Sequence, residues 1–269
     1  VIGILCAMLV AMVLLGGIKR IGSVSEKLVP FMALLYVLLG LGVVVLNITR
    51  LPEVLASIVV GAFNPKAFTG GAIGSLFISM QRGVSRGIFS NEAGLGTGSI
   101  AHACADTKKP VKQGMFGIFE VFADTIVICT MTGLSIVLTG AWQVEGLEGV
   151  QVTTYAFQKG LPFPNEFAAF VLMLCLVFFA FTTILGWDYY SERCLEYLTG
   201  GNMKKVMVFR WIYILAVFIG PYMTVSAVWT IADIFNGLMA LPNMIALFAL
   251  NGVVVYETKK FFEAGKHKK

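Results

Sequence analysis

Long apolar runs with few charges are the feature that most limits how this chain can fold. The first two occupy residues 1–17 and 28–47, and a membrane-spanning helix needs about 20 apolar residues. Of the 269 residues, 58% are hydrophobic and only 13% are charged, whereas soluble domains have about 25% charged residues. These values exclude a disordered chain, a collagen, a coiled coil and almost any soluble enzyme. They predict an all-α integral membrane protein with about seven or eight transmembrane helices.

The remaining crossings follow from apolar stretches farther along the chain. They are predicted at residues 115–138, 167–187 with an amphipathic extension to 198, 206–220, 223–241 and 243–256. Residues 48–71 are expected to form an outer loop with a short helix at 51–63, and residues 142–166 an acidic outer loop. Residues 1–258 would then make up a single transmembrane domain, followed by a basic tail at 259–269.

The loop charges predict the orientation in the membrane. Basic residues gather in cytoplasmic loops, so the net charge of +5 does not indicate nucleic-acid binding. Eight crossings would place the lysine-rich tail outside, whereas its charge favours the cytoplasm, and both alternatives stay open. Because the chain begins inside an apolar run, we expect a fragment of a longer protein. The five scattered cysteines predict neither a disulfide framework nor a zinc site.

The stretch 72–105 has the length of a crossing but not its composition. Arg82, Arg86 and Glu92 lie within it, and glycines interrupt it, with the strongest interruption expected over residues 87–98 (Gly87, Gly94, Gly96 and Gly98). A membrane helix can be broken only where protein or a water-filled cavity satisfies the freed backbone groups. In secondary transporters such breaks bind a substrate carboxylate and Na⁺. The alternative is that the glycines allow close helix packing, although the charged residues favour a site.

Several blocks resemble the alanine or glycine:cation symporter family. The most specific is Ser90-Asn91-Glu92-Ala93-Gly94 within the broken stretch, and similar blocks begin at Gly16, Phe181 and Ala232, so that the resemblance runs nearly end to end. One departure is Thr97-Gly98, where the family often has Ser-Ala-Pro.

The resemblance implies a LeuT-type fold built from inverted repeats, incomplete here and running from core helix 4 onward. Residues 72–105 would be core helix 6 and residues 167–198 core helix 8. It also implies a secondary active symporter that moves alanine or glycine with Na⁺ across the plasma membrane by alternating access. Its partners would be the amino acid, Na⁺ and the lipid bilayer, and no cofactor other than the coupling ion is expected.

The resemblance assigns roles to three residues at the break. Phe89 is expected to close over the substrate, and Ser90 and Asn91 to bind it. The alternatives are that Phe89 packs against lipid or protein and that the two polar residues cap a half-helix, although capping is compatible with binding.

On core helix 8, Thr182 and Thr183 are expected to coordinate Na⁺ through their hydroxyls. Thr183 and Trp187 are four residues apart and share one helix face, so both are expected to face the substrate. The alternatives are a hydroxyl bonded to its own i−4 carbonyl and a tryptophan at the membrane interface.

Other polar residues in the apolar stretches are interpreted as structural. Two pairs at i,i+4 spacing are expected to form buried ion pairs with each other: Arg82, Arg86, Glu120 and Asp124. Asp233 and Asn236 are expected to make interhelical hydrogen bonds, and His102 to have a structural or loop role.

Two further classes of function are alternatives to a symporter. An intramembrane enzyme would use Asp124, His102 or a serine, but no paired catalytic motif is present. A channel or sensor built on a transporter fold would give ionic current without saturable uptake. The preference between alanine and glycine, between D- and L-forms, and between Na⁺ and H⁺ coupling stays open at the level of sequence.

Overall fold

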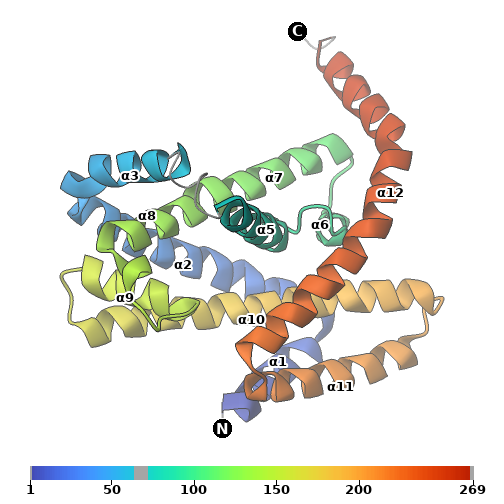
Figure 1. Cartoon of the computed structure of the whole chain (residues 1–269). Helices are drawn as coiled ribbons and strands as arrows, with labels where there is room; N and C mark the ends of the chain where they lie inside the picture. Colours follow the sequence, from blue (N-terminus) through green and yellow to red (C-terminus); the bar gives the residue numbers. More distant parts are fainter. Residues whose placement is uncertain (1, 64–71, 267–269) are drawn as a thin grey trace. The chain divides into compact units, whose positions relative to one another are not determined.

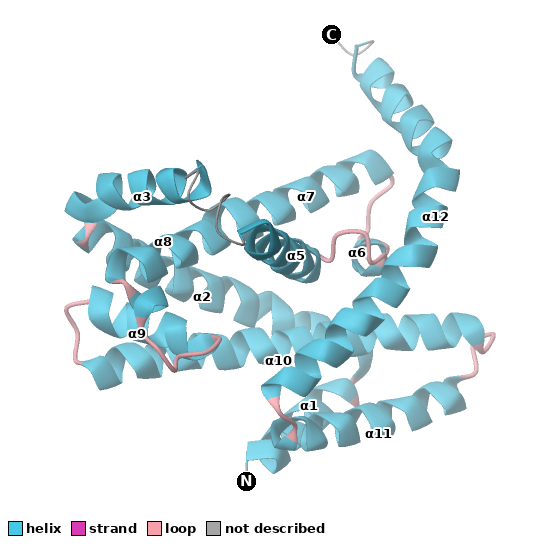
Figure 2. Cartoon of the chain, in the orientation of Figure 1, coloured by secondary structure: helices cyan, strands magenta, loops and turns pink. Residues whose placement is uncertain are grey.

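The computed structural model describes residues 2–63 and 72–266, and the regular structure of this part of the chain is entirely helical, without a strand (Figure 2). The all-α prediction is therefore confirmed. The ends of two predicted segments, residues 64–71 and 267–269, lie outside the described residues. The chain folds as two compact units, one made of Val1–Gly70 with Val127–Tyr222 and the other of Gly71–Ile126 with Met223–Lys269. Each unit is described below by itself.

The first unit contains seven α-helices within its described residues (Figure 1). They are α1 (Ile2–Leu14), α2 (Gly17–Leu46), α3 (Leu51–Phe63), α8 (Thr130–Thr139), α9 (Val150–Gly160), α10 (Asn165–Leu198) and α11 (Met203–Ile219). Short 3₁₀ turns flank three of them: η1 (Ile48–Arg50), η3 (Ala141–Gln143) and η4 (Gly220–Tyr222). The short helix expected at 51–63 and the continuous helix expected over 167–198 are both present.

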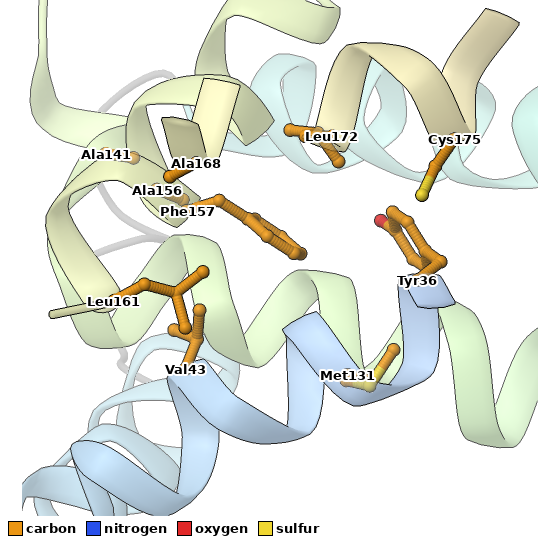
Figure 3. Packing of buried hydrophobic residues seen from close by; sticks show 10 residues of the cluster. All are labelled: Tyr36, Val43, Met131, Ala141, Ala156, Phe157, Leu161, Ala168, Leu172 and Cys175. Carbon is orange, nitrogen blue, oxygen red and sulfur yellow. The ribbon is translucent and has the colours of Figure 1, made fainter. Parts of the chain in front are cut away.

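The larger core of this unit lies between α2, α8, α9 and α10 (Figure 3). Phe157 of α9 is fully buried, and its ring centroid lies 5.7 Å from that of Tyr36. The Tyr36 hydroxyl is satisfied at 2.7 Å by Thr132 of α8. At Gly160 a β-carbon would come within 2.5 Å of Val43 Cγ1, so α9 meets α2 at a distance that only glycine permits.

The helix α9 lies within residues 142–166, which the sequence predicts as an acidic outer loop without naming a helix. Glycines and prolines at both ends of this segment indicated a loop, yet its middle forms a helix of 11 residues. Burial of Ala156 and Phe157 against α2 and α10 explains this outcome, because packing of an apolar face supplies most of the stability of short helices.

A smaller core joins α1, α10 and α11. Val10 and Leu14 of α1 are fully buried against Leu185 of α10 and Ile214 of α11. A β-carbon at Gly3 would lie 2.8 Å from the Phe218 carbonyl oxygen, so α1 and α11 also approach closely. Two of these helices, α10 and α11, are also joined by a buried ion pair between Glu192 and Arg210.

The second unit contains α5 (Ala72–Asn91), α6 (Thr97–His102), α7 (Pro110–Phe122) and α12 (Val225–Lys266). The helix α7 continues into a π-helical segment, η2 (Ala123–Cys129), within which the chain passes to the first unit. The prediction of two separate crossings at 223–241 and 243–256 is wrong. The helix α12 is one continuous helix that passes through Pro242 without ending. Proline removes one backbone hydrogen bond, and membrane helices tolerate this loss where neighbouring groups satisfy the freed carbonyl.

Four helical stretches among the described residues are long and apolar enough to cross a bilayer: Arg20–Leu46, Pro110–Thr139, Asn165–Leu198 and Val225–Ala264. A shorter apolar helix lies at Gly3–Leu14. Large hydrophobic side chains are exposed along these helices, for example Leu38, Phe119, Phe170 and Phe248 at 58–77%. Such surfaces suit lipid, and the chain is a membrane protein.

Candidate substrate and cation site

The break in the second unit is shorter than the sequence predicts. The helix α5 ends at Asn91 and α6 begins at Thr97, so only residues 92–96 are irregular. Gly87 lies inside α5, and Gly98 lies in the first turn of α6. Three residues of the break, Glu92, Gly94 and Gly96, have φ values of 51°, 79° and 86°. This left-handed region is open to glycine and costly for other residues, so Gly94 and Gly96 make the break possible.

Asn243 of α12 holds this break in place. The sequence did not indicate this residue as part of the site. Asn243 Nδ2 donates to the Gly94 carbonyl at 2.9 Å. A β-carbon at Gly96 would lie 2.8 Å from Asn243 Oδ1. The Thr97 hydroxyl, at the start of α6, is buried and has no hydrogen-bond partner among the described residues. Asn243 follows Pro242 directly, and this Pro-Asn pair was the available signal.

Ser90 and Asn91 both bond to the π-helical segment η2. Ser90 Oγ donates to Asp124 Oδ2 at 2.6 Å, and Thr125 Oγ1 donates to Asn91 Oδ1 at 2.9 Å. Asn91 Nδ2 also donates to the Gly87 carbonyl at 3.2 Å. The end of α5 is therefore fixed by two side-chain bonds to a π segment, a feature that is frequent at functional sites.

Phe89 packs against α12 rather than standing free. Its ring lies 5.2 Å from that of Trp229 at an interplanar angle of 65°. One turn earlier on α5, the Arg86 guanidinium lies 3.7 Å above the same Trp229 ring and forms a 3.2 Å ion pair with Asp233. Cation–π and ionic contacts thus hold one face of α5 against α12.

A pocket of about 430 Å³ adjoins this contact between α5 and α12. Its lining includes Gln81, Ser85, Asp233 and the buried Asn236. Ser85 Oγ donates to Asp233 Oδ1 at 2.9 Å, so the interhelical bond expected of Asp233 is confirmed.

The predicted ion pairs between the Arg82/Arg86 and Glu120/Asp124 pairs are wrong. Arg86 binds Asp233, Asp124 accepts from Ser90, and Arg82 makes no ion pair with a described residue. The reason is the position of each acid along α5, because Asp233 of α12 lies beside Arg86 whereas Asp124 of η2 lies beside Ser90, one turn farther along the helix.

His102 ties α6 to α7. Its Nδ1 lies 2.8 Å from Gln113 Nε2 and its Nε2 lies 3.3 Å from Glu120 Oε2. These contacts correspond to the structural role expected of this histidine.

The residues expected on core helix 8 lie on α10, in the first unit. Thr182 Oγ1 donates to the carbonyls of Phe178 and Phe179 at 3.0 and 3.1 Å. Thr183 is exposed, and the half-buried Trp187 stacks edge-on against Tyr190 at 5.8 Å. The bond from Thr182 to its own helix uses the hydroxyl hydrogen and leaves oxygen lone pairs that a cation can bind.

Comparison with known proteins decides the family. A family model described as the sodium:alanine symporter family matches residues 1–269, the whole chain. The chain belongs to this family. Among similar members, an uncharacterized transporter of Haemophilus influenzae is 48% identical, with 98% of this chain and 57% of that protein covered.

Two other members of the sodium:alanine symporter family carry more specific names. The sodium/alanine symporter AgcS of Methanococcus maripaludis is 42% identical, with 98% of this chain and 57% of that protein covered. The probable sodium/glutamine symporter GlnT of Bacillus subtilis is 36% identical over 97% of this chain and 53% of that protein. The chain therefore spans a little over half the length of these relatives. None of these names is that of an enzyme.

Proposed function

We propose that the protein containing this chain is a secondary active symporter that moves alanine or glycine with Na⁺ across the plasma membrane by alternating access. The observation that carries the proposal is the match of the sodium:alanine symporter family over the whole chain. Relatives named for alanine and for glutamine transport support amino acids as the substrate class.

The proposal includes a multi-pass LeuT-type fold of inverted repeats, in which α5 and α6 form the broken core helix and α10 is core helix 8. Phe89, Ser90 and Asn91 would bind the amino acid at the break. The buried Thr97 hydroxyl, which has no described partner, would add a donor for it. Gly94 and Gly96 would allow the break to change its angle, because their left-handed conformations suit glycine.

Thr182 and Thr183 would supply oxygen ligands to Na⁺, and Thr183 and Trp187 would also contact the substrate. Na⁺ would stabilise the outward-open state by binding it more tightly than the inward-open state, since a ligand shifts an equilibrium only by its differential affinity. The amino acid would then dock, Phe89 would turn over it, and the opposite side would open. In the structure the Phe89 ring packs against Trp229 of α12, and it would leave this contact when it turns over the amino acid.

The test is uptake of radiolabelled alanine into proteoliposomes that contain the full-length protein, with and without an inward Na⁺ gradient. We expect saturable, Na⁺-dependent uptake that competes with glycine. Phe89→Ala and Thr183→Ala should each lower it at least tenfold. Glutamine is added as a competitor, because one relative is named for that substrate.

Matched controls separate the site from general damage. Phe119 is 65% exposed on α7, so Phe119→Ala should transport normally. Thr154 bonds its own i−4 carbonyl on α9, as Thr182 does on α10, and Thr154→Ala should also transport normally. Uptake that survives both site substitutions would refute the site. Sustained current without saturable uptake would replace the symporter with a channel.

A further inference from the structure

A groove of about 560 Å³ lies between α7 and the C-terminal part of α12, both in the second unit. The start of α7 lies beside this part of α12 (Figure 1). A volume of about 300–1,000 Å³ is usual for sites that bind small ligands. The groove is separate from the break between α5 and α6, and the transport site described above does not use it.

Most of the groove is apolar. Its α7 wall includes Val111, Gly114, Met115 and Ile118, which share one helix face, and its α12 wall includes Val253 and Val254. A β-carbon at Gly114 would have nothing within 4 Å, so the floor of the groove is open. Both helices belong to stretches that are long and apolar enough to cross a bilayer. A hydrocarbon chain from the surrounding lipid therefore suits this part of the groove.

One end of the groove lies at the level of the membrane surface. Lys109 directly precedes the apolar stretch Pro110–Thr139, and its Nζ lies 5.9 Å from the centre of the Phe261 ring of α12. One turn away on α12, Lys260 Nζ lies 5.8 Å from the centre of the Tyr256 ring. Lysines beside aromatic rings are typical of the interface between lipid and water. The headgroup of a lipid in the groove would lie at this end.

This end of the groove carries charges of both signs. Lys109 is exposed, and Glu257 is a half-buried lining residue that makes no ion pair with a described residue. Glu257 precedes Phe261 by four residues, which is one helical turn or about 6 Å along α12. The carboxylate and the ammonium that lies over Phe261 are therefore about one turn apart.

These features fit a phospholipid that has both a phosphate and a primary amine. The phosphate would meet Lys109, and the ammonium would donate hydrogen bonds to Glu257, a charge-assisted contact of the strong kind. A headgroup with a negative charge alone would place that charge beside Glu257 without compensation. The quaternary amine of phosphatidylcholine is positive but has no N–H group to donate.

We propose that this groove binds one molecule of phosphatidylethanolamine, with an acyl chain between α7 and α12, its phosphate at Lys109 and its ammonium at Glu257. The inference goes beyond the proposed transport function and does not depend on which amino acid is carried. The bound lipid would stabilise the packing of α7 against α12.

The test measures lipid binding to the full-length protein, purified in detergent and depleted of lipid. Phosphatidylethanolamine, phosphatidylcholine and phosphatidylglycerol with identical acyl chains are added in turn, and bound lipid is counted by native mass spectrometry. We expect phosphatidylethanolamine to bind about tenfold more tightly than the other two, as a charge-assisted hydrogen bond implies. Glu257→Gln should abolish this preference. Lys109→Gln should weaken the binding of all three lipids, because they share the phosphate.

Gly114→Leu tests the apolar part of the groove. Its side chain would fill the open floor, so the binding of all three lipids should fall. Two matched controls should bind lipid as the unaltered protein does. Glu263→Gln changes an exposed carboxylate of α12 outside the groove lining, and Gly133→Leu changes an exposed helical glycine of α8 that also has nothing within 4 Å of an added carbon.

Three results would overturn the proposal. Absence of bound lipid in the unaltered protein would mean that another part of the full-length chain covers the groove. Equal binding of phosphatidylcholine or phosphatidylglycerol would remove the role of Glu257, and a preference that persists in Glu257→Gln would place the lipid elsewhere. If Gly114→Leu does not fold, thermal unfolding decides instead: phosphatidylethanolamine should raise the unfolding temperature of the unaltered protein more than that of Glu257→Gln. None of these measurements involves uptake, so failure of the symporter proposal would leave them unaffected.

Discussion

The break between α5 and α6 leaves no room for a β-carbon at Gly96, and this makes Gly96→Ala a sharp test. The residue has a φ of 86°, and its added carbon would lie 2.8 Å from Asn243 Oδ1. A left-handed conformation costs a residue other than glycine about 1–3 kcal/mol. Moving Asn243 away would also forfeit its bond to the Gly94 carbonyl, which is worth about 0.5–1.5 kcal/mol. Together these costs come to about 1.5–4.5 kcal/mol.

A double-mutant cycle measures the two costs separately. Thermal unfolding of the full-length protein in detergent is followed for Gly96→Ala, Asn243→Ala and the double variant. We expect Gly96→Ala to lose stability by the full amount in the unaltered background. In the Asn243→Ala background, only the backbone cost of about 1–3 kcal/mol should remain. Gly98→Ala is the control, because Gly98 lies in helical conformation with nothing within 4 Å of an added carbon. Equal stability of the Gly96→Ala and Gly98→Ala variants would refute this account of the break.

Two further predictions concern the first unit. Phe157→Ala should destabilise the protein by about 3–5 kcal/mol, because Phe157 is fully buried in the core of α2, α8, α9 and α10. The control is Phe170→Ala, at a residue that is 64% exposed. This variant should have little effect in the same thermal unfolding assay. Arg210→Met should cost about 3–5 kcal/mol, because it leaves Glu192 buried and unpaired. Arg193→Met, which removes a partly exposed ion pair, should cost less than about 1 kcal/mol. Equal losses of stability in these two arginine variants would contradict the claim that burial makes the Glu192–Arg210 pair costly to break.

Local composition predicted those parts of the fold that depend on neighbouring residues. The helix at 51–63 follows from an apolar run between polar loops, and α10 follows from a run that continues as an amphipathic end. The sequence did not reveal α9, because the glycines and prolines around it outweigh a helix of 11 residues whose stability comes from burying Phe157. It also divided α12 at Pro242, where the chain continues as one helix.

The partners of charged residues could not be predicted in the same way. The spacing of Arg82, Arg86, Glu120 and Asp124 suggested four mutual partners, but Arg86 meets Asp233, which is 147 residues away. Such pairings depend on which helices lie side by side, and helical periodicity does not carry that information. The same holds for the Asn243 contact with the break.

The central claim, that an amino acid and Na⁺ are bound by one coupled system, is tested most directly by equilibrium binding to the purified full-length protein. Alanine affinity is measured at increasing Na⁺ with choline as the balancing cation, and Na⁺ affinity is measured with and without alanine. Linkage requires both affinities to change by the same factor. We predict a rise of at least tenfold in each direction that is lost in Thr183→Ala. Alanine binding of equal strength in Na⁺ and in choline would contradict the account.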